Sequence, residues 1–89
     1  MLLARVMGSI WTTQKEKGME HLKLLIVQPE NFLEELEGNA FVAIDRIGAG
    51  VGELVLVTQG SPAQRLTGDK ESPIDAAIVG IVDSFELNN

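Results

Sequence analysis

The run with the clearest chemical pattern in this 89-residue chain is glycine-rich: residues 48–53 read GAGVGE. A dinucleotide-binding loop has the pattern G-x-G-x-x-G between a strand and a helix, and the pyrophosphate sits on the helix N-terminus. Here the third glycine comes one residue early, Glu53 stands where the last glycine belongs, and the residues that follow predict a strand. We therefore expect no cofactor at this run.

Two other interpretations of the glycine run stay open on the residues alone. Three glycines within five residues permit positive φ angles and close approach of a second backbone. The run is then either a tight connection between two strands or a flat surface on which another chain packs, with Glu53 as a charged contact.

Catalytic and metal-binding residues are sparse. His21 is the only histidine and there is no cysteine, so a zinc site lacks strong ligands. Ser61 and Ser72 each precede a proline, and this arrangement is typical of a helix N-cap. Pairs of acidic residues lie in polar stretches, where solvated surface is the simpler explanation. We predict no enzyme, no metal and no cofactor.

The charge balance narrows the possible partners. The chain has seven Lys and Arg residues and thirteen Asp and Glu residues, which give a net charge of −6. Nucleic-acid binding and anionic membranes both need cations, so this balance argues against them. The longest apolar runs have about four residues, whereas a membrane span needs about 20. Residues 1–11 include Arg5 and no cleavage-type site, which predicts mature structure and not a signal peptide.

Alternating apolar and β-branched residues predict strands in five segments, separated by glycine, proline and polar clusters. The segments are residues 2–11, 21–27, 41–47, 53–59 and 76–85. The second should stop before Pro29, which cannot donate to a ladder. In the first, the alternation places five residues on one face: Leu2, Ala4, Val6, Gly8 and Ile10.

Five strands of this kind predict an all-β fold, a five-stranded OB-like barrel formed as a single domain by residues 1–89. One or two short helical turns are expected at residues 61–64 and 72–75. Residues 31–38 could form another turn of helix, and a surface loop with a few tucked apolar residues fits equally well. Some strands are apolar on both faces, so we expect a neighbouring subunit to cover the outer face.

Four stretches together resemble one family. They read KLLIVQP (23–29), VAIDRIGAGVGE (42–53), VLVTQGS (55–61) and PIDAAIVGIVD (73–83). In order and spacing they are similar to the EutN/CcmL family, the vertex proteins of bacterial microcompartment shells. The resemblance implies a cyclic homopentamer that caps the fivefold vertices of an icosahedral shell in the bacterial cytoplasm.

The resemblance also implies a partner and a contact. The partner would be the hexameric shell proteins, and the glycine run would form the seam with them. The candidate contact residues are Gly48, Ala49, Gly50, Gly52 and Glu53.

The alternative function is a small OB-type binding module for single-stranded nucleic acid or peptide. Such a surface needs stacking aromatic residues beside cations. The aromatic residues of this chain are scattered, and core packing explains the phenylalanines better. They are Trp11, Phe32, Phe41 and Phe85.

Overall fold

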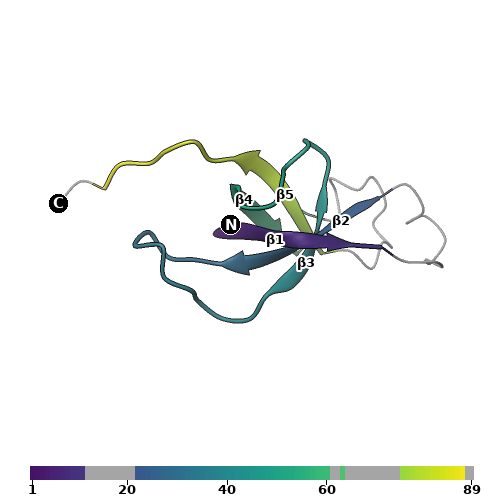
Figure 1. Cartoon of the computed structure of the whole chain (residues 1–89), viewed down its shortest axis with the longest axis horizontal. Helices are drawn as coiled ribbons and strands as arrows, with labels where there is room; N and C mark the ends of the chain where they lie inside the picture. The colour runs from purple at the N-terminus through teal and green to yellow at the C-terminus, as the bar shows by residue number, and fades with distance from the viewer. Residues whose placement is uncertain (12–21, 61–62, 64–74, 88–89) are drawn as a thin grey trace.

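Five strands form a closed barrel in the computed structural model, which describes residues 1–11, 22–60, 63 and 75–87 (Figure 1). The order around the barrel is β1-β2-β3-β5-β4, with β4 closing against β1. The strands are β1 (Leu2–Ile10), β2 (Lys23–Pro29), β3 (Phe41–Asp45), β4 (Leu54–Gln59) and β5 (Ala76–Ile81).

Neighbouring strands are antiparallel except β3 and β5, which run parallel. The five-stranded barrel expected from the sequence is therefore confirmed. The helical turns predicted at residues 61–64 and 72–75 lie mostly outside the described residues. Within the described part of the chain, no helix is both long and apolar enough to cross a bilayer.

The barrel interior is filled by small and medium apolar side chains from all five strands, with Ala49 added from the loop after β3. The barrel is narrow, and alanine and valine dominate the packing. The buried residues of this inner cluster are Ala4, Val6, Leu25, Val27, Ala43, Ala49, Val55, Val57, Ala76 and Ile78.

A bulge in β1 corrects the face assignment made from the sequence. The register passes from Val6 opposite Val27 to Gly8 opposite Ile26, so Met7 is an extra residue on β1. One inserted residue reverses the faces of everything after it, since side chains alternate with a period of two. The prediction that Gly8 and Ile10 share a face with Val6 is therefore wrong, and Ile10 packs against a second cluster on the outer face.

This outer cluster consists of Leu24, Ile44, Ala63 and Ala77. Ala63 belongs to the connection between β4 and β5 and is fully buried. The chain itself therefore covers part of the outer apolar face, which we expected a neighbouring subunit to cover. Other outer apolar side chains stay exposed, among them Val42 and Val79 at 38% each.

Several predicted strand ends shift for physical reasons. β2 continues through Pro29, which pairs with Ala4 on β1 only. Its pairing with β3 has ended at Val27, so Pro29 lies at an edge, where a missing N–H is tolerated. β5 ends at Ile81 and not at residue 85, because its partner β4 begins only at Leu54. One further bond, from Val82 N to Leu54 O at 2.8 Å, ends the pairing. Residues 82–87 leave the barrel as an extended arm (Figure 1).

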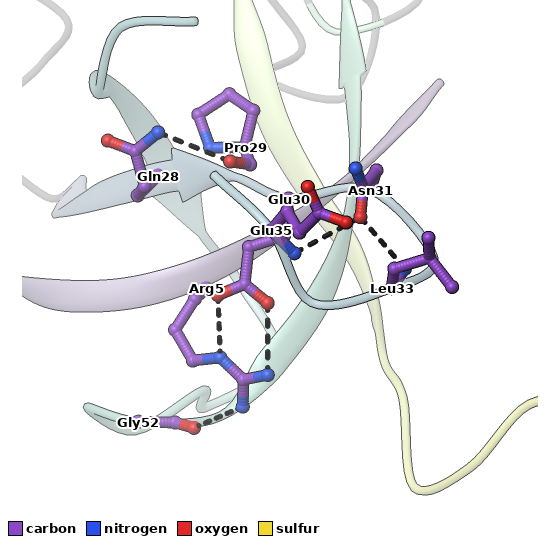
Figure 2. Close-up of polar contacts among 8 residues, drawn as sticks. All are labelled: Arg5, Gln28, Pro29, Glu30, Asn31, Leu33, Glu35 and Gly52. Atoms are coloured by element: carbon purple, nitrogen blue, oxygen red, sulfur yellow. Dashed lines mark hydrogen bonds and ion pairs between the residues drawn. The ribbon is translucent and has the colours of Figure 1, made fainter. Parts of the chain in front are cut away.

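Residues 31–38 form a turn and not a helix. Asn31 accepts hydrogen bonds at Oδ1 from the backbone N–H groups of Leu33 (2.8 Å) and Glu35 (3.1 Å), as Figure 2 shows. Glu34 takes a φ of +61°, which an α-helix does not allow. The loop alternative is correct, but Phe32 and Leu33 are 57% and 70% exposed rather than tucked.

Candidate functional site

The glycine run begins at a buried carboxylate. Asp45 is the last residue of β3, and its side chain is fully buried. Its Oδ1 accepts from the N–H groups of Ile47 (3.0 Å) and Gly48 (3.1 Å), and its Oδ2 accepts from Ala49 N–H at 2.9 Å. Three charge-assisted bonds to successive amides fix the backbone where the strand turns into the loop.

Lys23 neutralises this carboxylate from the neighbouring strand. It lies opposite Asp45 in the register of β2 and β3, and its Nζ is 3.3 Å from Asp45 Oδ2. The same ammonium donates to the carbonyl of Ala49 at 3.5 Å. The buried charge is thus both paired and fully hydrogen-bonded, as a carboxylate in a barrel wall must be.

The turn itself depends on glycine at its two ends. Gly48 and Gly52 have φ angles of +88° and +90°, a region that costs other residues strain. Glu53, directly after Gly52, donates its backbone N–H to the carbonyl of Gly50 at 3.1 Å, and its carboxylate accepts from Gly50 N–H. The run therefore forms a tight connection between strands, and the carboxylate of Glu53 helps to close it.

A second anchor joins the far end of the loop to β1. Gly52 N–H donates to the carbonyl of Val6 at 2.8 Å, and Val6 N–H donates to the carbonyl of Glu53 at 3.0 Å. Arg5 donates from Nη1 to the carbonyl of Gly52 at 3.0 Å, as Figure 2 shows. The loop is therefore fixed by β3 at its start and by β1 at its end.

Arg5 is held in place by Glu30. Its Nε and Nη2 donate to the two carboxylate oxygens of Glu30, each at 3.1 Å (Figure 2). The hydrogen bonding to Glu30 raises the pKa of the Arg5 guanidinium, which burial opposes. Arg5 consequently stays charged at every pH at which a protein is handled.

Replacing Arg5 by methionine should lower the free energy of unfolding by about 1–3 kcal/mol, because the Glu30 side chain is only 8% exposed and would lose its partner. The double variant Arg5→Met/Glu30→Met should recover part of this loss, since no carboxylate is then left unpaired. Urea unfolding of both single variants and the double variant measures the coupling. Strictly additive losses would show that the two side chains do not support each other.

The predicted site residues come together in one loop but play different parts. Gly48, Gly50 and Gly52 present backbone, and Glu53 bonds back to the turn. Ala49 is 2% exposed and packs into the barrel interior, so only its backbone can reach a partner.

Sequence reasoning missed the part that Asp45 plays, although an Asp two to four residues before a glycine turn is a signal for side-chain-to-backbone capping. It also passed over Val51, which is 70% exposed at the turn. His21 lies outside the described residues. Within the described residues no group of three metal-ligating side chains comes together.

This geometry presents a rigid backbone surface without an assembled nucleophile and base. A family model described as Ethanolamine utilisation protein EutN/carboxysome matches residues 1–83. The chain therefore belongs to the EutN/CcmL family. It is similar, at 43% identity over the full length of both chains, to the bacterial microcompartment shell vertex protein GrpN of Rhodospirillum rubrum. It is 40% identical to the carboxysome shell vertex protein CcmL of Synechococcus elongatus, over all of this chain and 90% of that protein.

Solved structures agree with these relatives. The pentameric microcompartment shell protein GrpN from Rhodospirillum rubrum superposes with a TM-score of 0.88 at 39% identity, covering 99% of this chain and 100% of that one. A structure of the ethanolamine utilization protein EutN gives a TM-score of 0.90 at 41% identity, covering 98% and 91%. The comparisons give no support to a binding module for single-stranded nucleic acid or peptide.

Proposed function

We propose that this chain is a structural vertex protein of a bacterial microcompartment shell in the cytoplasm. Its single domain assembles into a ring of five that closes the shell at its fivefold corners, beside hexameric shell proteins. The ring catalyses no reaction and binds no nucleic acid. The observation that carries this proposal is the end-to-end match, in sequence and in fold, with a pentameric shell protein.

Exposed apolar side chains in two separate regions of the surface support assembly into a ring. Subunits arranged head to tail use two different faces, so each chain must carry two complementary patches. Apolar side chains are exposed both on the outer face of β3 and β5 and in the turn at residues 31–38 with the C-terminal arm. These side chains are Val42 and Val79 on the strands, and Phe32, Leu33, Leu36, Phe85 and Leu87 in the turn and arm.

The glycine loop, formed by the glycine run at residues 48–53, is the surface that we assign to the contact with hexamers. Its backbone is fixed at both ends, and glycine at 48, 50 and 52 leaves that backbone open to a second chain. A preorganised loop loses little conformational entropy on docking. The candidate contact residues are Gly48, Ala49, Gly50, Gly52 and Glu53, with Ala49 contributing backbone only.

Gly50→Trp should leave the pentamer intact and reduce co-assembly with hexamers more than tenfold. Unlike Gly48 and Gly52, Gly50 does not have a positive φ, so a side chain there brings bulk without backbone strain. A Cβ at this position would lie 3.2 Å from Glu53 Oε1, and that side chain is exposed and can move. Native mass is measured first and should be about 48 kDa, the mass of five chains of 9.6 kDa. Co-sedimentation with hexamer sheets then measures co-assembly.

Gly50→Ala serves as the matched control, because it adds the Cβ without the bulk and should co-assemble within about threefold of wild type. A Gly50→Trp pentamer that co-assembles as wild type would remove the loop from the contact. A wild-type chain that stays at 9.6 kDa at high concentration would refute the vertex function itself.

A further inference from the structure

Within residues 48–53, which form the glycine loop, only one side chain points its apolar surface into solvent; Ile47, 47% exposed, lies just before this loop. The three glycines have none, Ala49 is 2% exposed in the barrel interior, and the Glu53 carboxylate bonds to the backbone of Gly50. Val51 is 70% exposed. In this loop, any recognition that depends on an apolar side chain therefore falls to Val51.

The loop holds Val51 in a fixed place. It follows Gly50, whose N–H is bonded to Glu53, and precedes Gly52, whose N–H and carbonyl are bonded to Val6 and Arg5. A β-branched side chain has few rotamers, so a valine on a fixed backbone is ordered before it binds. Little entropy is then lost when the side chain enters a partner.

We infer that Val51 is the specificity-determining side chain of the loop, and that it packs against apolar surface of the hexameric shell protein. The inference rests on the proposed contact between this loop and hexamers. It adds what the glycines cannot supply, since a bare backbone fits many partners and a side chain selects by shape and polarity.

Two substitutions separate shape from polarity. Val51→Thr keeps the shape and adds a hydroxyl, and should weaken co-sedimentation with hexamer sheets at least threefold. Val51→Lys changes both and should weaken it at least tenfold. Met7→Lys is the control, because Met7 is 57% exposed on β1, outside both the glycine loop and the apolar patches assigned to the ring, and it should co-assemble as wild type. Native mass is measured first, and all three variants should remain pentamers.

The outcomes distinguish this inference from the function on which it rests. If the Val51 variants bind hexamers as wild type while Gly50→Trp does not, Val51 has no selective role and the loop contact stands. If Val51→Lys no longer forms pentamers, Val51 contacts a sister subunit and the inference is wrong. If wild-type pentamers co-sediment with no hexameric shell protein of the same organism, both the proposed contact and the inference are wrong.

Discussion

Asp45→Ala should lower the free energy of unfolding by about 2–3 kcal/mol, although the residue lies at the end of a strand. The buried N–H of Ala49 would lose its acceptor, and an unsatisfied buried donor costs about 1–3 kcal/mol. The N–H groups of Ile47 and Gly48 lose less, because both residues are exposed and water can replace the carboxylate. For a domain of this size the melting temperature should fall by about 10–20 °C.

Melting is measured at a fixed protomer concentration, since assembly also stabilises the fold. Asp45→Asn should recover only part of the loss, because its oxygen can still serve two donors while its amide nitrogen faces the N–H of Ala49. Asp83→Ala, at an exposed position, is the control and should change the melting temperature by no more than about 4 °C. An Asp45→Ala protein that melts with wild type would show that the loop does not depend on this carboxylate.

Ile44→Ala should destabilise the protein by about 2–5 kcal/mol, the range for removing a large buried aliphatic side chain. Ile44 is fully buried, yet it packs on the outer face of the barrel, against Leu24, Ala63 and Ala77. The substitution therefore tests whether the chain covers that face itself. Urea unfolding gives the free energy.

A graded series makes the Ile44 result specific. Ile44→Val should cost only about 0.5–1.5 kcal/mol, since it removes one methyl group. Val51→Ala, at an exposed position, should cost less than about 0.5 kcal/mol. If Ile44→Ala and Ile44→Val have the same free energy of unfolding, the outer cluster is loosely packed.

Strand positions could be predicted from the alternation of apolar residues, because burial on one face of a sheet imposes a period of two. The bulges could not be predicted from that alternation. An extra residue such as Met7 in β1 carries no mark in the pattern, yet it moves Ile10 to the outer face. The same happens near the end of β5, where the register shift beside Val57 leaves Val79 unpaired in the ladder.

The position of the candidate loop could be predicted, but the contacts that hold it could not. Its glycines predicted a turn with positive φ, and Gly48 and Gly52 have it. The supports of the loop come from distant parts of the chain: Arg5 reaches a carbonyl 47 positions away, and Lys23 one 26 positions away. A single sequence does not state such pairings, so the contacts of Asp45 could not be predicted from it.

These long-range supports set the order in which the loop can form. The loop takes its shape only when β1 lies beside β4 and β2 lies beside β3, since its hydrogen bonds come from β1 and from the Asp45–Lys23 pair. Bringing such distant segments together requires nearly complete folding of the chain. A partly folded subunit therefore cannot form the loop that we propose as the docking surface, and under that proposal only a closed barrel can be incorporated at a shell corner.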